Sequence, residues 1–322
     1  MGIRSSFFVI TILLMHIVLP ASGQTFVFRV LANKGENQVR RASGKLEKLK
    51  TGAYLHKGDQ LVARDGSYIA LVHKSGKTIE IRQKGTLKVD DLATKVKAKT
   101  SSVSGRYMQY VMNRLGDDGV SDNFRQSSNV VGATVRGTEA DGIELLLPVV
   151  EEKKITVYGD QLWLRWIPED GKDSLFRGHT FVVTITNLSG EELFVYETRE
   201  SFAEIDLAGI EDSEELLLLR VVTKEEGGDG LYSVQYGVAK SDLTAKSEAL
   251  QNDLTSLQDE LDLSIAVNRL LLAAFYEENG MILEAMIQYE RLILEHPGVD
   301  DYLAFYQEFL SKNNMLNIPQ GK

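Results

Sequence analysis

The sequence predicts a multi-domain, mainly β protein that ends in an α-helical module. Three observations favour this fold class. Short runs of alternating apolar and polar residues, separated by glycine-containing turns, fill residues 25–90 and return in residues 150–240. After residue 240 the apolar residues recur at helical spacing. A content of 43% hydrophobic and 25% charged residues indicates a globular chain.

The first residues are typical of a secretory signal peptide. Arg4 precedes an apolar run over residues 7–19, and Ala21-Ser22-Gly23 supplies small residues before a cut at Gln24. The run is shorter than the roughly 20 residues that span a bilayer, which disfavours an uncleaved signal anchor. We therefore expect a signal peptide over residues 1–23 and an exported protein, periplasmic or cell-surface associated in a bacterium. No later stretch is apolar enough to predict a membrane span in the mature chain.

The region from residue 24 to residue 147 is expected to be an antiparallel β domain with one inserted helix. The helix is predicted near residues 103–115 from its apolar spacing. Ser75-Gly76-Lys77-Thr78 ends like a phosphate-binding loop, but Leu71 stands where that loop needs glycine, so we expect a β-turn. The expected strands lie near residues 26–30, 61–63, 68–72, 78–81 and 86–89.

Four motifs follow one another in this region. They are Gly58-Asp59, Asp65-Gly66-Ser67, Ser75-Gly76 and, after an insertion, Val135-Arg136-Gly137-Thr138-Glu139. In this order they resemble the FecR-type periplasmic sensor domain, and the resemblance covers roughly residues 25–147. It implies the domain type and a location outside the cytoplasm. Signalling members of that family also carry a cytoplasmic anti-sigma segment and a membrane span, which this sequence does not show, so transmembrane signalling is not implied.

Residues 148–240 predict a second β unit, a β-sandwich. Alternating runs occupy residues 161–166, 181–186, 193–198 and 216–222, and residues 187–191 form a hairpin-type connection. A tryptophan-containing early strand followed by several short strands is similar to an immunoglobulin or fibronectin type III sandwich. Such folds serve as spacers and as binding units alike, so the resemblance names no ligand.

Residues 241–322 predict helices, with Ser241 as the expected first cap. Leu243, Leu250, Leu254, Leu257 and Leu261 form one apolar stripe. The following pattern resembles a single tetratricopeptide repeat, and a further helix near residues 302–310 would cap it. The resemblance implies either a docking module or simply a packed helical bundle. The residues that carry it are Leu272, Ala273 and Tyr276 on the first helix, Gly280 at the turn, Ala285 and Tyr289 on the second helix, and Pro297 at the end.

Charge is distributed unevenly along the chain. Residues 24–115 contain 19 Lys and Arg against 7 Asp and Glu, whereas residues 116–322 contain 16 against 39. Such asymmetry favours an anionic partner for the basic part, either an external polymer or the acidic part of the same molecule. We favour internal docking, because the acidic part is present at high effective concentration. The candidate anion contacts are Arg40, Arg41, Lys95, Lys97, Lys99 and Arg136, although for Arg136 a local hydrogen-bonding role is favoured.

Chemistry-bearing motifs are few. The absence of cysteine excludes disulfides, thiolate metal sites and cysteine nucleophiles. The five histidines are not paired at metal-ligand spacing, and no serine-hydrolase motif occurs. We therefore expect no metal, no cofactor and no catalytic residue.

The sequence thus predicts an exported, non-enzymatic binding or scaffold protein of the cell envelope. Its expected partner is another envelope protein or an anionic envelope polymer, and no nucleic acid is expected. The alternatives are a cell-surface polysaccharide-binding protein and a carbohydrate-active hydrolase. The hydrolase would need two carboxylates facing each other across a cleft, which can come from anywhere in a chain.

Export gives the first testable prediction. If residues 1–23 are a cleaved signal peptide, mass spectrometry of the protein secreted from a bacterial host should find an N-terminus at or near Gln24. Cytoplasmic protein that retains Met1 would contradict export.

Overall fold

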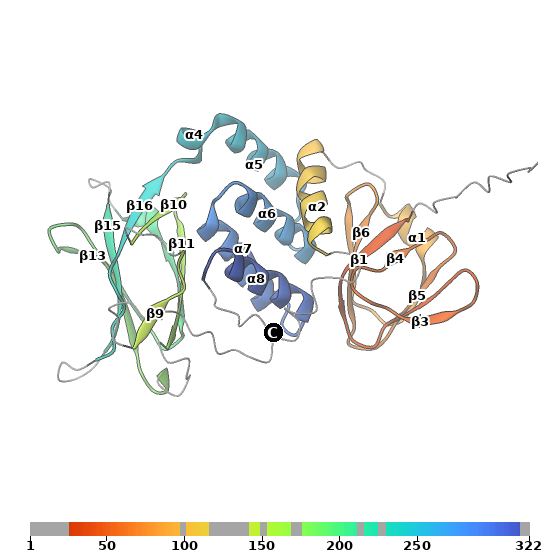
Figure 1. Ribbon diagram of the computed structural model, residues 1–322, viewed down its shortest axis with the longest axis horizontal. Helices are drawn as coiled ribbons and strands as arrows, with labels where there is room; N and C mark the ends of the chain where they lie inside the picture. The colour runs from red at the N-terminus through yellow and green to blue at the C-terminus, as the bar shows by residue number, and fades with distance from the viewer. Residues whose placement is uncertain are drawn as a thin grey trace, which may run out of the picture.

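The computed structural model describes residues 26–96, 101–115, 142–148, 153–168, 176–210, 216–224 and 230–315. Within these ranges the chain forms four β-sheets and seven α-helices, with a β unit at each end and six of the helices, all except α1, between them (Figure 1). The broad expectation of β-rich regions joined to C-terminal helices is confirmed. The expected signal peptide and the motif at residues 135–139 lie outside the described residues.

The N-terminal β unit consists of two four-stranded antiparallel sheets, ordered β4-β1-β6-β7 and β3-β2-β5-β8. The expected strands and the expected turn around Ser75 and Gly76 are confirmed, and a short helix, α1 (Val89–Thr94), follows the last strand. Phe28, Leu61 and Leu71 are fully buried in the core of this unit. The strands are β1 (Phe28–Lys34), β2 (Gln38–Arg40), β3 (Leu46–Lys48), β4 (Tyr54–Leu55), β5 (Gln60–Ala63), β6 (Tyr68–His73), β7 (Thr78–Ile81) and β8 (Gly85–Lys88).

Strand β6 is buried on both faces because it separates two cores. Ile69 and Leu71 belong to the core of the N-terminal unit, whereas Tyr68, Ala70 and Val72 belong to the larger core that includes the helices. Since side chains alternate between the two faces of a strand, one sheet serves as a wall shared by both cores. This explains the nearly continuous apolar sequence of β6.

The helices form the middle layer of the molecule. They are α2 (Ser102–Arg114), α4 (Leu243–Lys246), α5 (Glu248–Glu260), α6 (Ala266–Glu278), α7 (Ile282–Glu295) and α8 (Asp300–Lys312). The helix expected near residues 103–115 is confirmed, and it packs on α6 and α5, which come some 150 residues later. The prediction that Ser241 caps the first of these C-terminal helices was wrong, because the Asp242 carboxylate accepts the Thr244 N–H and caps α4. None of the helices described is both long and apolar enough to cross a membrane.

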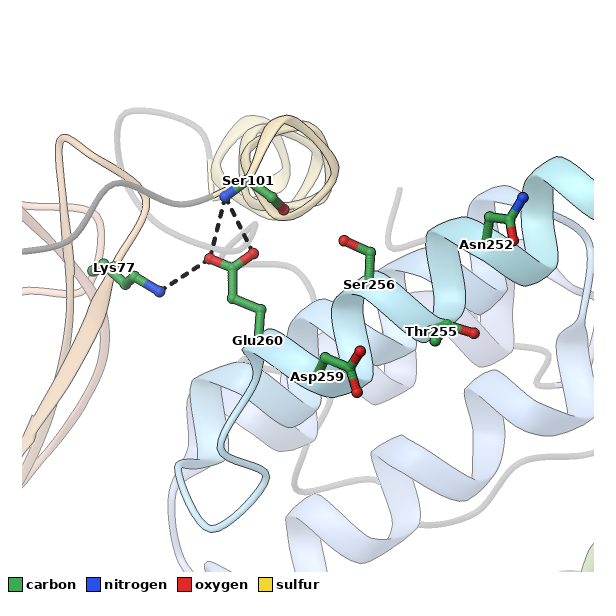
Figure 2. A pocket seen from close by; sticks show the side chains of 7 residues that line it. All are labelled: Lys77, Ser101, Asn252, Thr255, Ser256, Asp259 and Glu260. Atoms are coloured by element: carbon green, nitrogen blue, oxygen red, sulfur yellow. Dashed lines mark hydrogen bonds and ion pairs between the residues drawn. The ribbon is translucent and has the colours of Figure 1, made fainter.

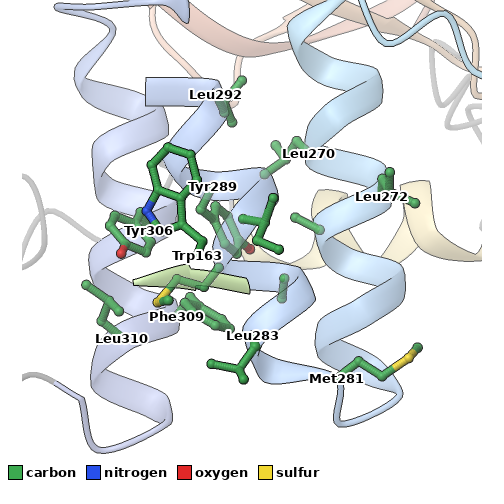
Figure 3. Close-up of a cluster of buried hydrophobic side chains, with 14 of the residues drawn as sticks. Trp163, Leu270, Leu272, Met281, Leu283, Tyr289, Leu292, Tyr306, Phe309 and Leu310 are labelled. Carbon is green, nitrogen blue, oxygen red and sulfur yellow. The ribbon is translucent and has the colours of Figure 1, made fainter. Parts of the chain in front are cut away.

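The α6–α7 hairpin holds the residues of the predicted repeat where the sequence placed them. Gly280 has a φ of +70° at the turn, a conformation that favours glycine. Ala273, Ala285 and Tyr289 are completely buried, and Figure 3 shows Tyr289 among side chains of α6, α7 and α8. Leu272 and Tyr276 lie on α6, and Pro297 follows α7. The tetratricopeptide identity itself stays a prediction.

The second β unit contains a five-stranded sheet, ordered β10-β16-β15-β12-β13, and a three-stranded sheet, ordered β14-β11-β9. The expected hairpin between β12 and β13 is confirmed. Strand β9 lies before residue 147, in the region assigned from sequence to the first domain, and pairs with β11. The strands are β9 (Ile143–Leu145), β10 (Lys154–Tyr158), β11 (Gln161–Pro168), β12 (Phe181–Thr186), β13 (Glu192–Thr198), β14 (Phe202–Asp206), β15 (Leu217–Thr223) and β16 (Tyr236–Ser241).

The two tryptophans of β11, Trp163 and Trp166, lie on opposite faces of the strand. Trp166 meets Phe181 of the five-stranded sheet edge to face. Trp163 stacks on Phe202 and lies beside α7 and α8 (Figure 3). The three-stranded sheet is therefore a second shared wall, between the helices and the five-stranded sheet.

Close packing at Ala285 gives a second prediction. Ala285→Arg should lower the free energy of unfolding of the mature chain by more than about 3 kcal/mol, because it forces a large charged side chain into a filled core. Chemical denaturation would measure the change. Leu294→Arg on the same helix is the matched control, since Leu294 is 51% exposed. Equal stability of the two variants would rule out the packing described here.

Candidate functional site

Among the described residues, three cations of the basic N-terminal half form direct ion pairs with the acidic helices. Lys77 lies 3.0 Å from Glu260, and Arg106 lies 2.5 Å from Asp253. Arg114, at the end of α2, lies 2.9 Å from Glu277. Part of the positive charge of the first half is therefore neutralised inside the molecule.

The ion pair between Arg114 and Glu277 is the most deeply buried of these contacts. The Glu277 carboxylate is 1% exposed and accepts hydrogen bonds from Arg114, Tyr110, Tyr289 and Lys312. Burial by itself raises the pKa of Glu277, but Arg114 together with the hydrogen bonds from Lys312 and Tyr110 lowers it overall. The carboxylate is thus held ionised in the core, where an unpaired charge would cost several kcal/mol.

Equivalent contacts join the helices to both β units. Arg165 of β11 donates two hydrogen bonds to Glu290 of α7, at 2.6 and 2.5 Å. On the opposite side, Asp301 of α8 accepts hydrogen bonds from the Asn33 backbone and from the Thr51 hydroxyl. Each β unit is therefore anchored to the helical layer by a carboxylate.

An open depression of about 600 Å³, lined by polar side chains, lies beside the ion pair between Lys77 and Glu260 (Figure 2). Burial raises the pKa of Glu260, but hydrogen bonds from Ser101, Ser104 and Lys77 outweigh it and lower the pKa to about 2. Asp259, the other carboxylate at the depression, is its neighbour on α5, and consecutive helical residues do not face each other. Glu260 is thus an ionised structural group, and the two do not form an opposed acid–base pair.

The predicted anion contacts separate into three groups. Arg41 faces its own domain, where it lies 2.8 Å from Glu47 and 3.0 Å from Asp59. Arg40, directly before it, and Lys95, after α1, are exposed, and neither has an ion-pair partner among the described residues. The remaining candidates, Lys97, Lys99 and Arg136, lie outside the described residues.

Arg40 belongs to what we call the cationic sheet face, the outer face of the sheet β3-β2-β5-β8. Cross-strand pairing places Arg40 beside Gln60, which in turn lies beside Lys88, and places Lys48 beside Gln38. The alternate residues of these strands, such as Val39 and Leu61, point into the core. The eight side chains that share the outer face are Leu46, Arg40, Gln60, Lys88, Lys48, Gln38, Val62 and Thr86, so no carboxylate stands among them.

The cations of this face are largely uncommitted. In the described part of the chain, Arg40 and Lys88 have no ion-pair partner. Lys48 reaches Glu36 at 3.2 Å, but both side chains are more than half exposed, so the pair contributes little. Figure 1 shows β3 and β5 at the end of the molecule away from the helical layer, and Arg40, Lys48 and Lys88 are all exposed.

Sequence reasoning found Arg40 but missed Lys48 and Lys88. The signal for Lys88 was available in the strand expected near residues 86–89, where Leu87 alternates with Lys88. Lys88 and Arg40 share a face because β5 pairs with both β2 and β8. This strand order cannot be read from a single sequence.

Among the residues described, no three His, Asp or Glu side chains are placed to hold a metal ion. No protein-family model matches the chain, and no curated protein matches it either.

A buried carboxyl between α7 and β10 gives a third prediction. Glu284 accepts the Tyr158 N–H, and burial raises its pKa to about 7. Because this pKa is raised above the ordinary value near 4.5, the stability that the neutral carboxyl contributes is complete below about pH 4.5 and is lost as pH rises through 7. Glu284→Gln should therefore stabilise the protein by about 2 kcal/mol at pH 8 and leave it nearly unchanged at pH 4.

Thermal and urea unfolding at both pH values would measure this difference. Glu248→Gln, at an exposed position of α5, is the control for a change of one surface charge. A stabilisation that is the same at pH 4 and pH 8 would show that Glu284 does not titrate between them.

Proposed function

We propose that the chain is an exported, non-enzymatic scaffold of the cell envelope that binds an anionic envelope polymer on the cationic sheet face. The observation that carries the proposal is the grouping of Arg40, Lys48 and Lys88 on a sheet face whose own strand residues include no carboxylate. Strands lie about 4.8 Å apart, so Arg40 on β2 and Lys88 on β8, with β5 between them, start roughly 10 Å apart. Two anionic groups of one polymer chain can be bound at once across such a distance.

Internal docking and polymer binding are both compatible with this arrangement, because they use different cations. Lys77, Arg106 and Arg114 serve the contacts with the helices. Arg40 and Lys88 form no such contact in the described residues. The helical layer then acts as the internal connector of the scaffold, and this supports placing the external partner on the outer faces of the sheets.

The resemblance to a FecR-type domain and the expected signal peptide support a location in the envelope. The amide side chain of Gln60 lies between Arg40 and Lys88, and that of Gln38 lies beside Lys48, and both can donate to hydroxyl or carboxylate oxygens. A polymer that presents both groups, such as an acidic polysaccharide, therefore fits the face better than a purely phosphorylated chain.

The proposal is tested with the mature chain, residues 24–322, and dextran sulfate as the probe. We expect binding at 50 mM salt that weakens at least tenfold at 200 mM, because exposed charges are screened within about 10 Å at 0.1 M salt. The triple variant Arg40→Gln, Lys48→Gln, Lys88→Gln should bind at least tenfold more weakly than wild type. Titration calorimetry or fluorescence anisotropy would measure both effects.

Two controls separate the site from net charge. Uncharged dextran tests for recognition of the polysaccharide backbone alone. The variant Lys154→Gln, Arg177→Gln, Lys224→Gln removes the same number of charges from exposed positions on the second β unit, and it should retain the wild-type affinity. Equal losses in the two triple variants, or no binding of dextran sulfate at 50 mM salt, would refute the proposal.

A further inference from the structure

The side chains of the cationic sheet face stand in two rows that cross the strands. Residues that are paired across neighbouring strands lie side by side on one face. The first row therefore runs from β3 to β8 through Leu46, Arg40, Gln60 and Lys88, and the three pairings along it are in regular register. The second row contains a single cation, Lys48. On this face, two cations share a line only in the first row.

The first row alternates uncharged and positively charged side chains. Leu46 is apolar and 48% exposed, and Arg40 is an exposed cation. Gln60 is an uncharged amide, and Lys88 is again an exposed cation. Because neighbouring strands lie about 4.8 Å apart, the two cationic side chains leave the backbone about 10 Å apart. A ligand that matches this row alternates in charge with the same spacing.

The carboxylates next to this row are already engaged. Asp59 is 3% exposed and accepts hydrogen bonds from Arg41 and from two backbone N–H groups. Asp90 accepts a backbone N–H from the turn before β5. Within the described residues, neither carboxylate forms an ion pair with Arg40 or Lys88. The positive charges of the row therefore remain available to an external anion.

The repeat of an extended, β-linked polysaccharide fits this spacing. Each sugar lengthens such a chain by about one strand separation, so two sugars cover the distance from Arg40 to Lys88. We propose, on the basis of the function proposed above, that the polymer is an acidic polysaccharide with one carboxylate on every second sugar, lying along the first row and across the strands. Acidic sugars then lie over Arg40 and Lys88, and neutral sugars lie over Gln60 and Leu46.

The uncharged positions of the row suit neutral sugars. The Gln60 amide can donate to hydroxyl groups and accept from them. One face of a sugar ring is formed by C–H groups, which can cover the exposed apolar surface of Leu46. A polymer with a carboxylate on every sugar would place half of its charges where the row has no cation. An extended peptide rises about 3.3 Å per residue, so its same-face side chains recur every 7 Å or so and do not match the row.

Two β-linked octasaccharides test the spacing on the mature chain, residues 24–322. The hyaluronan octasaccharide carries a carboxylate on every second sugar, and the polymannuronate octasaccharide carries one on every sugar. We expect the hyaluronan probe to bind at least about threefold more tightly at 50 mM salt, because its carboxylates meet the cations of the row in step. Attraction by net charge alone predicts the opposite order, since the mannuronate probe carries more charge. Titration calorimetry would measure both dissociation constants.

A cation added to the first row should reverse this order. Gln60→Lys places a third positive charge between Arg40 and Lys88, so this variant should bind the mannuronate probe more tightly than the hyaluronan probe. Thr86→Lys is the matched control, because it adds the same charge to the second row at an exposed position. This control should keep the wild-type order. A reversal in both variants would contradict a ligand that follows the first row.

The outcomes separate the repeat of the polymer from polymer binding itself. A wild-type chain that does not bind the hyaluronan probe more tightly than the mannuronate probe overturns the alternating repeat. The proposed function still stands in that case if dextran sulfate binds and the triple variant of Arg40, Lys48 and Lys88 weakens its binding. A chain that binds neither octasaccharide and does not bind dextran sulfate overturns both.

Discussion

The architecture depends on burying charged carboxylates of the helices against cations from distant parts of the chain. Glu277 and Glu290 are 1% and 2% exposed, and their guanidinium partners, Arg114 and Arg165, come from α2 and β11. A buried ion pair adds little net stability over a hydrophobic contact, but removing one partner leaves a charge that costs about 3–5 kcal/mol. Such pairs therefore specify which surfaces must meet, while the surrounding apolar core supplies most of the stabilising free energy.

This arrangement determines which surfaces of the described residues stay exposed. The helices are covered by a β unit on each side (Figure 1), so much of their surface is used within the molecule. The outer faces and edges of the terminal sheets stay open. At one end this surface is cationic and polar, around Arg40 and Lys88, and at the other it is an apolar edge, around Val195. The two ends therefore present chemically different surfaces.

Much of the secondary structure could be predicted from the sequence, because alternation and helical spacing are local signals. The helix near residues 103–115, the hairpin at residues 187–191 and the turn at Gly280 depend on such signals. The layer order could not be predicted, since it depends on contacts such as Arg114 with Glu277, which lie 163 residues apart. Arg40 and Arg41 are neighbours in sequence, but the first faces solvent at a strand end and the second is held by Glu47 and Asp59.

The shared wall formed by β6 has a consequence for how the chain acquires its structure. The core containing Phe28 and Leu71 can form from the first hundred residues, since all its members lie before residue 97. The opposite side of the same strand, with Tyr68 and Ala70, receives its cover from helices near the C-terminus, including Tyr302 of α8. During synthesis this apolar side of β6 therefore stays uncovered until the C-terminal helices have been made. Such long-range contacts slow folding and expose intermediates to aggregation. A protein built in this way benefits from a chaperone, or from remaining unfolded until its last residues have emerged.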